Sequence, residues 1–156
     1  MLYVSNNTHP ECTYTINACA QHWIAPQKSH AEAVKRIGQY LKGCIDDGLI
    51  IKHDKKIPLT LDCHCDADFA GNYNKIDSQD PSSVKSKTGF IITLRGVLVI
   101  WASKMQTEIA LSTMEAEHTF LSTAMRLLIH LCSLCFKMND GFDLDLVMRV
   151  THFYCL

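Results

Sequence analysis

The stretch "LTLDCHCDAD", Leu59 to Asp68, decides the fold, because apolar and polar residues alternate along it. In an extended chain, successive side chains point to opposite faces. One face therefore carries apolar side chains and cysteines. The other carries mostly polar ones, including three aspartates. This period of two predicts a half-buried β-strand with an acidic outer face, which includes Asp66 and Asp68.

Upstream of this strand the apolar period is 3.6 residues, which is typical of helices. Helices are predicted over "THPECTYTINACAQHW", residues 8–23, and "SHAEAVKRIGQYLKG", residues 29–43. Thr8 with Glu11, and Ser29 with Glu32, have the spacing of a capping box at a helix start. Residues 1–57 are therefore expected to form a separate helical segment.

Downstream of the strand, "TGFIITL", the turn "RG" and "VLVIWAS" predict a hairpin over residues 88–103. A long helix is then expected from Ser112 to Met138. The predicted fold class is α/β, with a three-stranded antiparallel meander and a long helix over residues 58–138. Residues 139–156 match no clear template and form a divergent tail.

Composition excludes some function classes. The chain has 156 residues, 47% of them hydrophobic, but no apolar run long enough to span a membrane. No signal peptide is recognisable, so we expect an intracellular protein, cytoplasmic or nuclear, with reduced core cysteines. Cys132 and Cys135 leave open a zinc-dependent binding module. The net charge is −1, although Lys85, Lys87 and Lys104 lie in a stretch without acids.

Four carboxylates are candidates for chemistry. On the long helix, Glu115 can close a capping box with Ser112, whereas Glu117 aligns with the apolar stripe, where a carboxylate needs a partner. On the strand, Asp66 and Asp68 lie about 6.6 Å apart on the polar face. An acidic strand opposite an inward glutamate is a common way to build a magnesium site. A buried ion pair for Glu117 and a loop cap for Asp68 are the alternatives.

Four motifs make the chain resemble a known family. They are "DADFAG", "SKTGFI", "WASKMQ" and "ALSTMEAEH", spanning residues 66–118. In this order they resemble the Pol polyprotein of copia-type retrotransposons, from the end of its reverse transcriptase into its ribonuclease H domain. The resemblance covers roughly residues 8–130. It implies that residues 1–57 are the helical tail of the reverse transcriptase and that residues 58–138 begin the ribonuclease H fold.

In the intact family this region is a metal-dependent ribonuclease H that cuts the RNA strand of RNA–DNA hybrids. The resemblance implies that Asp66 and Glu117 are catalytic metal ligands for Mg²⁺ or Mn²⁺. Asp68 does not match a catalytic position of the family, but its place on the same strand face makes it a further candidate ligand. It implies the hybrid and the rest of the Pol polyprotein as partners, and no membrane. Hybrids are recognised by groove shape and 2′-hydroxyls. The candidate contacts to the nucleic-acid backbone are Lys85, Lys87 and Lys104.

The sequence departs from the family in ways that argue against activity. The family usually has an Asp followed by Asn in a strand after the long helix. Here no Asp-Asn pair occurs, and no acidic residue follows Asp145. We therefore expect a truncated, inactive ribonuclease H with weak or absent metal binding. The alternative is a non-enzymatic interaction domain or a transposon relic, with an open sheet edge beside the first strand.

Overall fold

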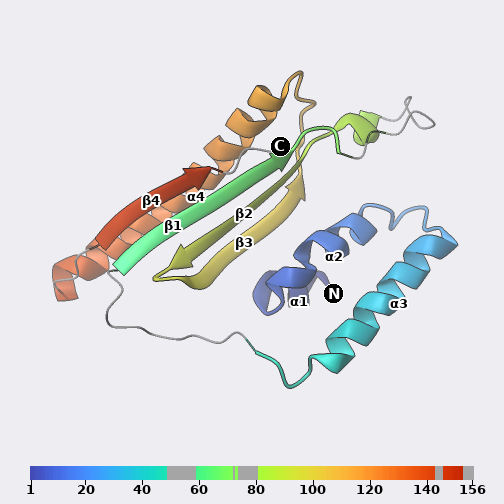
Figure 1. The fold of residues 1–156 in the computed structure, drawn as a ribbon, viewed down its shortest axis with the longest axis horizontal. Helices are drawn as coiled ribbons and strands as arrows, with labels where there is room; N and C mark the ends of the chain where they lie inside the picture. The colour runs from blue at the N-terminus through green and yellow to red at the C-terminus, as the bar shows by residue number, and fades with distance from the viewer. Residues whose placement is uncertain (49–58, 72, 74–80, 143–145, 153–156) are drawn as a thin grey trace. The chain divides into compact units, whose positions relative to one another are not determined.

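The change of apolar period near residue 58 separates a helical unit, Met1–Ile51, from a unit built around a sheet, Lys52–Leu156. Both are described from a computed structural model (Figure 1), which covers residues 1–48, 59–71, 73, 81–142 and 146–152. Each unit is described by itself below.

The described part of the helical unit, residues 1–48, contains three α-helices and a 3₁₀ turn. These are α1 (Leu2–Asn7), the turn Pro10–Cys12, α2 (Thr13–Ala20) and α3 (Lys28–Gly43). Cys12, Ile16 and Ile37 form its small buried core. Helix α1 precedes the first segment predicted to be helical, and the 3₁₀ turn replaces that segment's expected first turn.

Both predicted capping boxes in this unit are wrong. The Thr8 hydroxyl donates to the Val4 carbonyl (3.0 Å), because Thr8 ends α1 instead of beginning the next helix. Helix α3 begins one residue before Ser29, and its cap is formed by Gln27 and His30. The Gln27 N–H donates to His30 Nδ1 at 3.1 Å. An imidazole nitrogen thus plays the part expected of the Glu32 carboxylate.

The sheet has the order β3-β2-β1-β4. Its strands are β1 (Leu59–Asp68), β2 (Lys87–Leu94), β3 (Val97–Met105) and β4 (Leu146–His152), and a 3₁₀ turn, Pro81–Val84, precedes β2. Strands β1, β2 and β3 form the predicted antiparallel meander. The two residues between β2 and β3, Arg95 and Gly96, have φ angles of 55° and 76°. Positive φ at both positions suits a tight hairpin turn.

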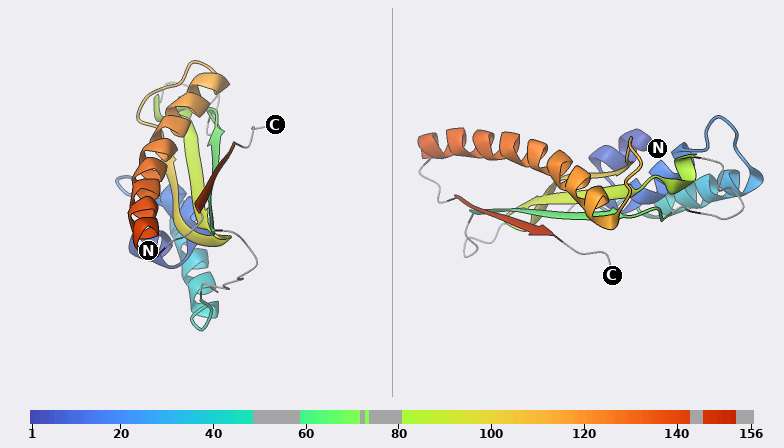
Figure 2. Two further views of the ribbon diagram at one scale, coloured as in Figure 1. Left: turned by 90° about the vertical axis from the view of Figure 1, so that its left-hand side faces the viewer. Right: turned by 90° about the horizontal axis from the view of Figure 1, so that it is seen from above.

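The long helix α4 (Thr113–Phe142) covers one face of the sheet, as Figures 1 and 2 show. The core beneath it contains Leu61, Cys63, Cys65 and Ala67 from β1, all at most 3% exposed. Asp66 and Asp68 on the opposite face are exposed. The predicted half-buried strand with an acidic outer face is therefore confirmed.

Two expectations for the C-terminal part need correction. Helix α4 extends four residues past Met138, and β4 follows it within the expected divergent tail. Strand β4 pairs in parallel with β1, from Leu59 opposite Leu146 to Cys65 opposite His152. The edge beside the first strand is thus occupied, and β3 and β4 are the outer strands of this sheet. Pairing of β4 supplies partners for the backbone groups of β1.

Candidate functional site

The four motifs meet at the C-terminal end of β1, where α4 also begins (Figure 1). Gln106, from "WASKMQ", is 7% exposed and joins three of them. Its backbone N–H donates to the Ser86 carbonyl (2.8 Å), and its side-chain Nε2 donates to the Ala116 carbonyl (2.8 Å). The buried Ser86 hydroxyl accepts the Ala70 N–H of the "DADFAG" motif at 3.4 Å. These bonds hold the first turn of α4 against the sheet.

Asp68 lies over the turn that follows β1. A Cβ added to Gly71 would collide with the Asp68 carboxylate, so this position suits glycine. Ala70, between them, has a φ of 50°, which is uncommon for a residue with a side chain. This packing supports the interpretation of Asp68 as a loop cap, while its role as a metal ligand stays a prediction.

The two glutamates of α4 differ as expected. The Glu115 N–H donates to the Ser112 hydroxyl (3.1 Å), and the Glu115 carboxylate accepts the Leu111 N–H (2.7 Å). Both groups act as a cap for the start of α4, in the manner of a capping box. Glu115 is exposed, whereas Glu117 is partly buried.

Of the apolar stripe predicted in line with Glu117 (Leu121, Ala124 and Leu128), Ala124 and Leu128 are buried against the sheet, but the stripe begins at Ala116 and not at Glu117. The residues buried against the sheet are Ala116, Phe120, Ala124, Leu128 and Cys132. Glu117 and Leu121 flank this stripe and are partly buried. The reason is size, because alanine at position 116 lets the helix approach the sheet closely, with the Ala116 side chain fully buried.

Asp66 and Glu117 lie at the same end of the sheet, but the face of β1 that contacts α4 is not the acidic face that we expected. Helix α4 packs on the apolar face of β1, and strand alternation turns the Asp66 side chain toward the other face. Asp66 Oδ1 accepts the N–H of Ala67 at 2.9 Å. Within the described residues, no group of three or more His, Cys, Asp or Glu side chains is assembled that could hold a metal ion.

Strand β4 lies where a further carboxylate would be needed, but its sequence, "LVMRVTH", contains no Asp or Glu. In register, its last residue pairs with Cys65, next to Asp66. The strand therefore completes the sheet without adding an acidic side chain at the Asp66 end. Asp145, the last acidic residue of the chain, lies outside the described residues.

The three candidate lysines have different surroundings. Lys104 is exposed, Lys85 is partly buried, and Lys87 is only 9% exposed. Lys87 is the cross-strand neighbour of Asp68 on β2. A lysine with so little exposed surface is poorly placed to contact a phosphate, so Lys87 is the weakest of the three candidates.

None of the seven cysteines that the structure describes forms a disulfide. Burial, and then the neighbouring Cys65, raise the pKa of Cys63 to about 11. Burial also raises the pKa of Cys65 and Cys132. Neutral, buried thiols are poor nucleophiles and poor metal ligands. These three cysteines are therefore part of the core, and they do not support the zinc alternative.

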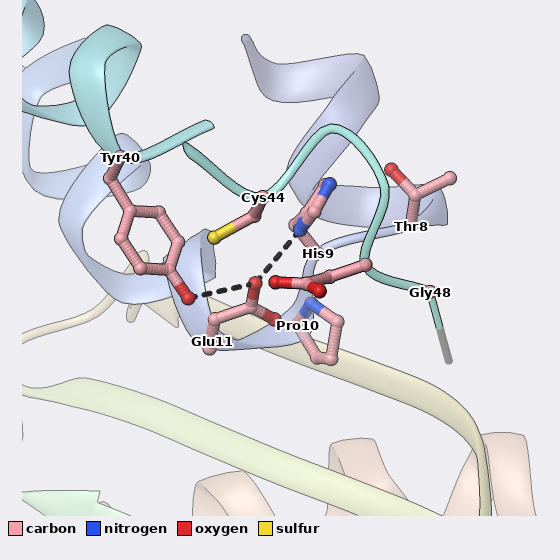
Figure 3. Close-up of a pocket in the computed structure, with 8 residues that line it drawn as sticks. Thr8, His9, Pro10, Glu11, Tyr40, Cys44 and Gly48 are labelled. Carbon is pink, nitrogen blue, oxygen red and sulfur yellow. Dashed lines mark hydrogen bonds and ion pairs between the residues drawn. The ribbon is translucent and has the colours of Figure 1, made fainter. Parts of the chain in front are cut away.

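A second polar cluster occurs in the helical unit, where the "THPE" segment meets the end of α3 (Figure 3). The Glu11 carboxylate bonds to His9 Nδ1 (2.8 Å) and accepts the Tyr40 hydroxyl (3.4 Å). Burial raises the pKa of Glu11, but its hydrogen bonds, and first the one to His9, lower the pKa by more than burial raises it. The pKa of Glu11 is therefore lowered overall. A hydrogen bond to Cys44 raises the pKa of Tyr40 to about 12. The cluster borders a cavity of about 220 Å³.

Against the expectation from the sequence, the length and composition of residues Thr113–Met138 of α4 would by themselves allow this segment to cross a membrane. The core helix of a water-soluble protein can meet the same criteria, and α4 packs its buried stripe against the sheet. The expectation that no membrane is involved stays a prediction.

Sequence comparison relates these motifs to known proteins. The chain is 32% identical over 127 residues to the retrovirus-related Pol polyprotein from transposon RE2 of Arabidopsis thaliana, which covers 81% of this chain. It is 36% identical over 118 residues to the corresponding polyprotein from transposon TNT 1-94 of Nicotiana tabacum, which covers 76% of this chain. The chain is a distant homologue of copia-type retrotransposon Pol polyproteins.

The homology to Pol is local, since the matched region spans 8% of the length of each of these polyproteins. Another relative is the secreted RxLR effector protein 161 of Plasmopara viticola, which is 31% identical to this chain over 124 residues. The match covers 80% of this chain and 80% of the relative. No family model matches the chain. No solved structure matches it.

Sequence reasoning did not identify Ser86 and Gln106 as the buried polar residues that connect the motifs at this end of the sheet. Ser86 and Gln106 lie inside quoted motifs, but polar residues beside a strand usually suggest solvent exposure. Their burial became apparent only from the hydrogen bonds that cross between elements. The "AG" that closes "DADFAG" was the one available signal, because a glycine after a strand often marks a close approach of other atoms.

Proposed function

We propose that the chain is the segment of a copia-type Pol polyprotein that joins the end of the reverse transcriptase to its ribonuclease H domain. The helical unit is then the tail of the polymerase, and the sheet unit is ribonuclease H-like. Topology supports this proposal. An antiparallel meander, a long helix and a strand parallel to β1 follow one another in the order that the family fold requires.

We propose further that this chain does not cut RNA–DNA hybrids at a useful rate. The observation that carries this proposal is that β4 runs beside β1 toward Asp66 without any acidic residue. Hydrolysis of a phosphodiester with two metal ions needs several carboxylates, which hold the ions about 3.5–4 Å apart. A misplacement of about 1 Å can cost on the order of 100-fold in rate.

The residues that the structure describes do not fit a two-metal site. Asp66 and Glu117 are the carboxylates that match the family's ligands, and α4 packs on the face of β1 away from the Asp66 side chain. Mg²⁺ keeps its water ligands unless several oxygen ligands replace them. Two carboxylates alone would hold one such ion weakly.

The experiment is a hybrid-cleavage assay with the full chain. An RNA–DNA hybrid labelled on the RNA strand is incubated with millimolar Mg²⁺ or Mn²⁺, beside the Asp66→Asn and Glu117→Gln variants. We expect the same background in all three proteins, since a contaminating nuclease does not depend on either carboxylate. Cleavage by the unmodified chain that disappears in Asp66→Asn would overturn the inactive assignment and support an active ribonuclease H.

A second candidate function is that of a separate interaction protein without nuclease activity. The observation that favours it is the relative from Plasmopara viticola, which matches this chain over 80% of both lengths and is named a secreted effector. Binding of an uncleavable hybrid distinguishes the two functions. Fluorescence anisotropy should show salt-dependent affinity for the hybrid if the chain is a Pol segment, and no preference for it over DNA duplex if it is not.

A further inference from the structure

An apolar groove of about 630 Å³ lies within the helical unit. It lies between α1, α2, the connection after α2, and the first half of α3. Ile16 and Ile37 form its floor and belong to the buried core, while Tyr3 and Trp23 at its border are 78% and 77% exposed. Small-molecule sites typically have volumes of about 300–1,000 Å³ and largely apolar walls. The size and lining therefore suit a small ligand.

Two histidines supply the polar part of this groove. The rings of His22 and His30 stack with their centroids 4.1 Å apart and their planes 11° from parallel, and both residues line the groove. His30 Nδ1 accepts the Gln27 N–H at the start of α3. In a neutral imidazole, the other nitrogen then carries the proton. The capping bond thus fixes His30 as a hydrogen-bond donor through Nε2.

We propose that this groove binds a planar aromatic molecule that carries a carboxylate. The apolar floor and the aromatic border fit a flat ring system, which can stack against aromatic side chains in an offset or edge-to-face manner. His30 Nε2–H offers a donor for a carboxylate oxygen. Among the described residues that line the groove, none has an acidic side chain, so an organic anion meets no opposing carboxylate from them. This site is independent of the proposed nuclease function.

The first test uses the full chain and two probes of one shape and opposite charge. Binding of 2-naphthoate and of 2-naphthylmethylammonium is measured by saturation-transfer difference NMR titration. We expect saturable binding of the naphthoate and about tenfold weaker binding of the ammonium ion, because a charged hydrogen bond is worth about this factor. Equal affinities, or no saturable binding of naphthoate, would overturn the proposal.

The second test places the naphthoate in the groove. Ala31→Phe adds a ring to a lining position of α3, while Gln39→Phe adds the same ring to an exposed position of α3 outside the groove. We expect Ala31→Phe to weaken naphthoate binding about tenfold by occupying the space, and Gln39→Phe to leave it unchanged. Val34→Trp serves as a second filling variant if Ala31→Phe changes the far-UV circular dichroism. Unchanged affinity in a folded filling variant would refute the location.

Discussion

Gln106 should be the polar residue on which the sheet unit depends most, and Gln106→Met tests this. Methionine keeps the length and apolar stem of glutamine but removes the side-chain donor to the Ala116 carbonyl, a bond of 2.8 Å between groups with almost no exposure. A neutral hydrogen bond contributes about 1 kcal/mol net, and a buried carbonyl left without a partner costs about 1–3 kcal/mol. The Ala116 carbonyl still has its helical partner. We therefore expect a loss of about 1–2 kcal/mol in the free energy of unfolding.

Urea denaturation measures this loss, and tryptophan fluorescence can report on the sheet unit alone. In a Trp23→Phe background, the remaining tryptophan is Trp101 on β3. With an m-value of about 1–3 kcal/mol/M, the midpoint should fall by about 0.3–2 M. Arg126→Met, at an exposed site on α4 in the same unit, is the control and should stay within about 0.5 kcal/mol. A midpoint for Gln106→Met equal to that of the control would refute the role of this hydrogen bond.

Three further outcomes follow from the described contacts. Gly71→Ala should destabilise the sheet unit, and adding Asp68→Ala should relieve part of this loss. In a double-mutant cycle we expect a coupling energy of about 0.5–1 kcal/mol between the two positions, and additive effects would contradict the packing of the Asp68 carboxylate on the turn. Glu115→Ala should cost about 1 kcal/mol in urea denaturation through loss of the cap of α4, and a neutral effect would show that the cap is dispensable. Because the pKa of Glu11 is lowered in the folded state, Glu11 should contribute stability that is present above its unfolded pKa near 4.5 and lost as pH falls through the folded value. Glu11→Gln should therefore reduce the fall in melting temperature at acidic pH, measured by circular dichroism. An unchanged fall would exclude the bond with His9 as its source.

The meander was predictable because its pattern is local and redundant. Alternation over ten residues of β1 fixes which side chains face the core, since a shift by one residue would bury Asp66 and expose Cys65. The Arg95–Gly96 turn then fixes the pairing of β2 with β3. Each of these signals lies within a few residues of the structure that it determines, so no knowledge of distant contacts was needed.

The helix starts were predicted less well because several residues can cap the same turn. Ser29 and Glu32 have the expected spacing, yet the cap is formed two residues earlier, by Gln27 and His30. Cap spacing identifies the approximate start of a helix, and the side chain that wins depends on local geometry that composition does not reveal.

The candidate metal site shows why the sequence alone does not decide which residues of α4 face the sheet. Positions 116 and 117 differ by about 100° around α4, and a stripe read through Leu121 or through Phe120 is almost equally apolar. The decision is made by the sheet, because the small Ala116 side chain fits against β1 and Gln106 bonds to its carbonyl. Once Ala116 faces the sheet, Glu117 must lie at the flank of the helix. A carboxylate at that flank lies beside the buried stripe, at the end of the sheet where β1 ends. A complete metal site would therefore need a carboxylate from the neighbouring strand, and β4, which occupies that place, has none.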